Sequence, residues 1–113
     1  MPRRDPVILY QHMLDHAQEA VGLVQGKTRA DLDTDRLLNL ALVRLLEIIG
    51  EAANQISEET RDALPHLPWM DMLNMRHRLV HAYYDINLNI VWVTIQDDLP
   101  SLIKALEEIP DLK

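Results

Sequence analysis

The sequence predicts an all-α fold, an antiparallel bundle of four to five helices. Apolar residues make up 48% of the chain, yet few β-branched runs alternate with the period of two that indicates a half-buried strand. The chain holds only three glycines, and Gly26 has the position of a helix stop. We therefore expect no sheet. Residues 1–113 should form a single domain, because a chain of 113 residues can bury one core but not two.

The first helix should begin at Asp5-Pro6, a capping residue followed by proline at the first helical position, and continue to about Val24. Residues 27–33 then form a polar connection. The predicted buried stripe of the first helix consists of Tyr10, Met13, Leu14, Ala17, Val21 and Val24.

The second helix is expected from Thr34 or Asp35 to Ile56, and it is apolar nearly all round. Such a helix is either central in the fold or lies in an oligomer interface. Gly50 most simply marks a close helix crossing, because glycine inside a helix costs roughly 1 kcal/mol and needs a packing reason.

Polar residues form one narrow stripe on this helix: Arg44, Glu47 and Glu51 recur at spacings of three and four. Two interpretations remain open. The stripe is a solvated edge, or it faces a cleft shared with the segment around Arg76 and orients the side chains of that segment.

Three further helices complete the bundle. Ser57 can cap a short helix that ends before Pro65, and Pro68 can start a helix over residues 69–83. The last helix should start at Asn87 or Asn89 and bend near Pro100. Its expected buried residues are Leu88, Val91, Trp92, Ile95, Leu99, Leu102, Ile103 and Leu106.

A cluster of reactive residues stands out in the otherwise apolar and acidic chain. The nine residues from Arg76 to Tyr84 contain two arginines, two histidines and two tyrosines. Arginine matches phosphate oxygens geometrically at any working pH, and histidine changes charge close to neutrality. The pair can hold a phosphate and move protons around it, which indicates phosphodiester chemistry.

An ideal helix would separate the two reactive groups. Arg76 falls within an apolar arc, where a charge must be paired, for instance with Glu47 or Glu51, or must line a cleft between chains. His81 would lie about 140° away on the same helix. Either the helix ends near His81, or a symmetric dimer brings His81 of one chain against Arg76 of another.

Composition excludes several function classes. A net charge of −7 argues against a protein that coats nucleic acid non-specifically, and the absence of cysteine excludes disulfides and thiol chemistry. With no apolar run of membrane-spanning length and no signal-peptide stretch, we expect a cytoplasmic protein without membrane contact. His12 and His16 resemble half of a zinc pair, but no glutamate follows His12 in the metalloprotease arrangement. We expect solvent-facing histidines, no metal and no cofactor.

The motif Arg76-x4-His81-x-Tyr83 resembles the R-x4-6-H signature of HEPN ribonucleases, and the subgroup it most resembles is HepT. The similarity covers almost the whole chain: residues 46–53, Trp69, Met75-Arg76, Val91-Trp92 and Asp98-Leu99-Pro100 follow in the same order. One departure is Ala82, where many relatives have glycine; alanine mildly stiffens the corner beside His81.

The resemblance implies a HEPN-type helical bundle that forms a homodimer, with both motifs meeting at the dimer cleft, and metal-independent RNA cleavage. In that mechanism His81 assists removal of the 2′-hydroxyl proton or protonates the leaving 5′-oxygen, while Arg76 stabilises charge in the transition state. His77 would orient the substrate or Arg76. Arg78 would contact a neighbouring phosphate or serve as an exposed, solubilising arginine.

The resemblance also implies a partner. HepT-like proteins resemble toxins of HEPN/MNT toxin-antitoxin systems, in which a minimal nucleotidyltransferase (MNT) antitoxin transfers AMP to the tyrosine of R-x4-H-x-Y, here Tyr83. The alternative function is a catalytically inactive HEPN module that only dimerises and binds the nucleotidyltransferase. Tyr84 is expected to be an adjacent packed aromatic.

Overall fold

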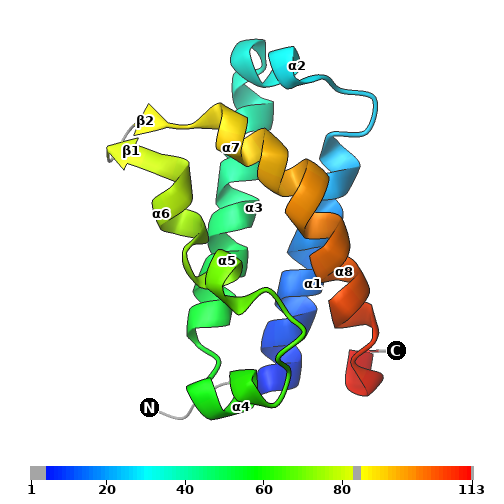
Figure 1. Ribbon diagram of the computed structural model, residues 1–113. Coiled ribbons are helices and arrows are strands. Elements are labelled where there is room, and N and C mark those ends of the chain that lie inside the picture. Colours follow the sequence, from blue (N-terminus) through cyan, green and yellow to red (C-terminus); the bar gives the residue numbers. More distant parts are fainter. Residues whose placement is uncertain (1–4, 83–84, 113) are drawn as a thin grey trace.

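Three long helical segments lie side by side and form the body of the molecule (Figure 1). The computed structural model describes residues 5–82 and 85–112. The segments are α1 (Pro6–Leu23), α3 (Arg36–Asn54), and a C-terminal segment made of α7 (Leu88–Val93), the π-helix η1 (Thr94–Asp98) and α8 (Leu99–Glu107), followed by the short 3₁₀-helix η2 (Pro110–Leu112). Helix α1 packs against both α3 and α8.

Helix α1 begins and ends where the sequence predicts. The Asp5 carboxylate accepts a hydrogen bond from the Val7 N–H at 2.9 Å, and Pro6 occupies the first turn. After Val24 the chain turns at Gly26, whose φ of +76° favours glycine. The predicted stripe is confirmed, with Val21 only partly buried and Leu9 and Ala20 added to it.

The polar connection predicted over residues 27–33 is wrong, because α2 (Arg29–Thr34) forms there. Its start is stabilised by the Thr28 N–H, which donates to the Asp31 carboxylate at 2.7 Å. Leu32 is fully buried. A capping residue followed three positions later by an acidic residue was the local signal for this helix.

Helix α3 has one face in the core and one face open. Asp35 caps its first turn by accepting from the Leu38 N–H at 3.0 Å, and the helix ends at Asn54, shortly before the predicted Ile56. Leu37 and Leu40 are 81% and 48% exposed. Helix α3 is therefore central in the bundle and also presents apolar residues on its outer side.

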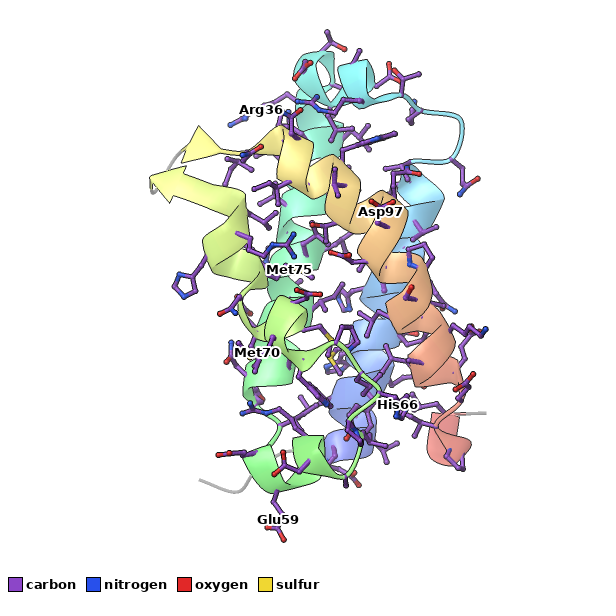
Figure 2. The ribbon with its side chains drawn as sticks, viewed as in Figure 1. Arg36, Glu59, His66, Met70, Met75 and Asp97 are labelled. Atoms are coloured by element: carbon purple, nitrogen blue, oxygen red, sulfur yellow. The ribbon has the colours of Figure 1, made fainter. Side chains whose placement is uncertain are left out.

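The predicted helix crossing at Gly50 is confirmed. A Cβ atom at this position would lie 3.1 Å from the Met72 carbonyl oxygen and 3.7 Å from the Met75 Cβ. The absence of a side chain thus lets the residues of α5 (Trp69–Leu73) and α6 (Met75–Leu79) approach the α3 backbone. Figure 2 labels Met75 at the point where this segment lies over α3.

The single helix predicted over residues 69–83 is wrong. The short helix α4 (Glu58–Asp62), capped by Ser57 as expected, is followed by α5, but α5 ends at Leu73 and α6 ends at Leu79. The Asn74 N–H closes α5 by donating to the Met70 carbonyl at 3.0 Å, and the Asn74 carbonyl opens α6 by accepting from the Arg78 N–H at 3.0 Å. The helix is therefore interrupted at Asn74.

A small antiparallel hairpin follows, so the prediction of no sheet is also wrong. Strand β1 (Val80–Ala82) pairs with β2 (Asp85–Ile86), with an irregular register between Val80 and Ala82. The Asn87 N–H donates to the Leu79 carbonyl at 2.7 Å, which closes the hairpin at its base. Because the sheet is so small, the all-α class predicted from the sequence still holds.

The C-terminal segment starts at Leu88, with the Asn87 side chain accepting from the N–H groups of Asn89 and Ile90. The bend expected near Pro100 is preceded by a π-helical turn, in which the Leu99 N–H donates to the Thr94 carbonyl five residues earlier. Proline cannot donate in a regular ladder, and the wider turn accommodates it. The predicted residues are buried, with Leu88, Trp92 and Ile103 only partly so.

Candidate functional site

The two residues predicted to be catalytic lie in different elements. Arg76 is in α6 and His81 is in β1, because the helix ends at Leu79. The separation of about 140° expected on a continuous helix therefore does not apply. Of the two solutions considered from the sequence, the fold has the first, a helix that ends just before His81. The side chains of both residues, together with Tyr83 and Tyr84, lie outside the described part of the structure.

The segment that carries the motif is part of a region of short helices and strands, residues 69–82 and 85–86, which we call the motif arm (Figure 1). Two apolar side chains anchor the motif to the core, since Met75 is 2% exposed and Leu79 fully buried. Both α5 and α6 pack against α3, and α6 also contacts α7. Arg76 and His77 follow one anchor and Val80 and His81 follow the other.

Arg78 is partly exposed and forms ion pairs with two aspartates. Its Nη1 atom lies 3.5 Å from Oδ2 of Asp98 in η1 and 3.8 Å from Oδ1 of Asp71 in α5. The arginine side chain is 36% exposed. His77, by contrast, is exposed on α6.

The acidic stripe of α3 divides into two parts. Glu51 accepts from Arg44 at 3.1 Å, and both side chains are about half exposed, which is the solvated-edge interpretation. Glu47 is partly buried and lies one turn before Gly50, on the helix that the motif arm crosses. A pairing of Glu47 or Glu51 with Arg76 stays a prediction, since the Arg76 side chain lies outside the described residues.

The two histidines of α1, predicted to face solvent, are partly exposed and partly buried. Nδ1 of His16 lies 2.6 Å from the His12 carbonyl oxygen, and the two rings meet edge to face at 6.4 Å. A carbonyl can only accept, so this ring nitrogen carries the proton. Among the side chains that the structure describes, no three from His, Asp or Glu gather in a way that could hold a metal ion.

Sequence reasoning missed the partners of Arg78. Asp71 received no role, and Asp98 was noticed only within Asp98-Leu99-Pro100. The available signal was Pro100, because a proline two residues after Asp98 indicates a local change of helix geometry.

The helices in the described part of the chain are all too short or too polar to cross a membrane.

Comparison with known proteins identifies the family. The profile described as ribonuclease HepT-like matches residues 13–109. The chain belongs to this ribonuclease HepT-like family. This membership and the all-α fold agree with what the resemblance of the sequence implied.

Individual relatives cover most of the chain. A protein of Thermococcus cleftensis named "Probable ribonuclease HepT" is 34% identical over 104 residues, which are 88% of this chain and 94% of the relative. A "Putative RNase" of Caldanaerobacter subterraneus is 36% identical over 99 residues, 88% of each chain. A protein of Methanocaldococcus jannaschii named "Gamma-glutamylcyclotransferase and putative RNase" is 32% identical over 111 residues, 95% of this chain and 50% of the relative. No solved structure matches the chain.

Proposed function

We propose that this protein is a metal-independent endoribonuclease that acts as the toxin of a HEPN/MNT toxin-antitoxin system in the cytoplasm. The observation that carries the proposal is the end of α6 at Leu79, which puts Arg76 on a helix and His81 on the strand that follows. Membership of the ribonuclease HepT-like family supports the same activity. The site is a composite one, with R-x4-H motifs of two protomers facing a shared cleft.

The reaction is an internal transesterification of RNA. The 2′-oxygen attacks the adjacent phosphorus, a new P–O bond forms, the P–O5′ bond breaks, and the 5′-hydroxyl leaves. His81 takes the 2′-hydroxyl proton or supplies the proton to the 5′-oxygen. Arg76 stabilises the extra negative charge on the phosphorus oxygens, which is largest in the transition state. The products carry a 2′,3′-cyclic phosphate, and DNA, which lacks the 2′-hydroxyl, is not cut.

The residues around this pair have supporting roles. His77, exposed on α6, orients RNA, and Glu47, one turn before Gly50 on α3, holds Arg76 in position. Glu51 supports that orientation through its ion pair with Arg44 on the same helix.

A second copy of the chain completes the site. The exposed Leu37 and Leu40 on α3 are the apolar residues that such a copy would cover. Leu37→Asp should therefore weaken the dimer in sedimentation velocity, whereas Leu23→Asp at the end of α1, where the leucine is 37% exposed, should not. A chain that stays monomeric at every concentration while it cleaves RNA contradicts the composite site.

Modification of Tyr83 by the antitoxin switches the enzyme off. The Tyr83 phenol oxygen attacks the α-phosphorus of ATP, a P–O bond forms, the α–β anhydride breaks, and pyrophosphate leaves. The attached AMP adds bulk and negative charge two residues after His81, where it competes with an RNA phosphate for Arg76. Intact-mass and peptide analysis after incubation with an MNT enzyme and ATP should find AMP on Tyr83.

The alternative is a catalytically inactive HEPN module that dimerises and binds a nucleotidyltransferase. Family membership alone is compatible with it, because a fold and a motif do not guarantee turnover. The distinguishing property is cleavage by the isolated chain.

The decisive experiment is RNA cleavage by the unmodified protein in excess EDTA. Wild type should cleave, and Arg76→Ala and His81→Ala should each lower the rate by about 10²- to 10⁴-fold. His66→Ala, an exposed histidine in the turn before α5 (Figure 2), is the matched control and should keep the full rate. Absence of cleavage of varied RNAs by a folded dimer free of AMP would establish the inactive module instead.

A further inference from the structure

We propose that Arg78 is a positioning residue that fixes the end of α6 through Asp98 and Asp71, and that it is not a contact for RNA phosphate. The expected effect on the RNA cleavage rate rests on the proposed ribonuclease function, whereas the expected effect on the α6 end rests on geometry alone. Arg78 is the arginine of the R-x4-H segment whose side-chain contacts the structure describes.

The position of Arg78 is the first step. It lies two residues after Arg76 and three before His81, one residue from the end of α6. Its Nη1 atom is 3.5 Å from Asp98 and 3.8 Å from Asp71. One guanidinium therefore joins three elements, α5, α6 and η1, at the place where the chain leaves the helix for β1.

The charge balance is the second step. Two carboxylates face this guanidinium, and Asp98 is only 29% exposed. An RNA phosphate that approached Arg78 would have to displace these carboxylates or share the guanidinium with them, against two negative charges. This arrangement favours a structural role for Arg78 over phosphate binding.

The π-helix supplies the third step. Pro100 and the i→i−5 hydrogen bond from Leu99 to Thr94 locally widen the helix just where Asp98 leaves it. A π-helical turn holds about one residue more than an α-helical turn, and one residue corresponds to a rotation of about 100° about the helix axis. In a regular α-helix, Asp98 would therefore point in another direction relative to the residues before η1. The π turn thus sets the direction from which Asp98 meets Arg78. π-turns are frequent where a function needs such a redirected side chain.

The ion pairs of Arg78 act on the position of the α6 end and not on the stability of the whole bundle. Two long pairs at a half-exposed arginine contribute little to global stability. Their effect is local, because α6 is only five residues long and cannot hold its own end. Loosening this end should disturb the spacing of Arg76 and His81 without unfolding the bundle.

The test compares Asp98→Asn with Asp97→Asn. Both residues lie in η1 and lose the same charge, but Asp97, labelled in Figure 2, is exposed and takes part in neither ion pair of Arg78. Hydrogen exchange of the amides of residues 76–82 should be faster by about tenfold in Asp98→Asn and unchanged in Asp97→Asn. Thermal melting should fall by less than about 4 °C in either variant.

Kinetics then separate positioning from phosphate binding. At saturating RNA in EDTA, Asp98→Asn should cut the single-turnover rate about tenfold, while the Kd for a 2′-O-methyl RNA of the same sequence stays within about twofold. If Arg78 bound phosphate, removing Asp98 would free the guanidinium, tighten RNA binding and leave or raise the rate. That outcome overturns the proposal. Asp98→Glu, which restores the charge, should recover most of the rate.

The two proposals fail in different ways. If wild type does not cleave RNA but exchange at residues 76–82 still quickens only in Asp98→Asn, the ribonuclease function is wrong and the positioning role stands. If wild type cleaves and Asp98→Asn matches Asp97→Asn in both exchange and rate, the positioning role is wrong. Should Asp98→Asn not fold, Asp71→Asn replaces it with the same readouts and a smaller expected change, since its pair is longer.

Discussion

The bundle and the motif arm are held together by different means. Helices α1 and α3 are 18 and 19 residues long and bury apolar stripes against one another, and α1 also packs against α8. Helices α5 and α6 are five residues each, and the strands after them are shorter still. A helix of five residues is unstable alone. The motif arm therefore depends on its contacts with α3 and on a few polar contacts. We expect substitutions in the bundle to lower the free energy of unfolding more than substitutions in the arm.

The largest stability effect should come from the bundle. Leu46 is fully buried in α3, and Leu46→Ala should lower the free energy of unfolding by about 2–5 kcal/mol through lost burial and the cavity left behind. Leu37→Ala, on the same helix but 81% exposed, should change it by less than about 0.5 kcal/mol at low protein concentration. Urea unfolding followed by circular dichroism measures both. Equal losses from the two variants would mean that α3 has no distinct inner and outer faces.

The junction between the two regions should give the next effect. Gly50→Val places a side chain against the Met72 carbonyl, 3.1 Å from the new Cβ, and should cost about 1–3 kcal/mol. The same change at Gly22, where nothing lies within 4 Å, should be nearly neutral. Hydrogen exchange should show that Gly50→Val loosens residues 69–82 more than α1. Uniform loosening of both regions would contradict a separate arm.

A smaller effect belongs to Tyr10 in the core of the bundle. Its side chain is 4% exposed, and no group in the described part of the chain bonds its hydroxyl. Burial raises the pKa of Tyr10 above its ordinary value of 10.0. Above pH 10 the unfolded chain loses this proton more readily than the folded one, so stability is complete below pH 10 and falls as the pH rises beyond it.

Tyr10→Phe should remove that part of the loss and change the free energy of unfolding at pH 7 by no more than about 1 kcal/mol. Because alkaline pH also acts on the rest of the chain, the measured quantity is the difference between wild type and Tyr10→Phe in urea unfolding at pH 8 and pH 10.5. Parallel pH profiles for the two proteins would show that the hydroxyl is not desolvated.

The smallest effect should be at the exposed ion pair of α3. Glu51→Gln breaks the contact with Arg44 and should lower the free energy of unfolding by about 0.2–0.5 kcal/mol, an effect that vanishes in 1 M salt. If Glu51 orients Arg76 as proposed, the same variant should lower the RNA cleavage rate at constant Kd. An unchanged rate would assign Glu51 to the solvated edge alone.

Much of the bundle follows from local and periodic signals. Asp5-Pro6, Asp35, Ser57 and Asn87 cap the helices that the sequence predicts from them. Capping is a contact between near neighbours, and a buried stripe repeats with the helical period, so both are readable along the chain. The capping pair Thr28 and Asp31 is also a local signal for α2, although the sequence analysis predicts a polar connection there.

The site was only partly predictable. The all-α class, the central helix around Gly50 and the grouping of Arg76, His77, Arg78 and His81 in one short segment can be read along the chain. Contacts in the folded molecule interrupt this segment at Asn74, end the helix at Leu79 and form a hairpin closed by Asn87. The fold also brings Arg78 to Asp98, twenty residues further along. Helix propensity over residues 69–83 is a local property, whereas the hydrogen bond from the Asn87 N–H to the Leu79 carbonyl and the ion pair of Arg78 with Asp98 join residues that local sequence patterns do not connect.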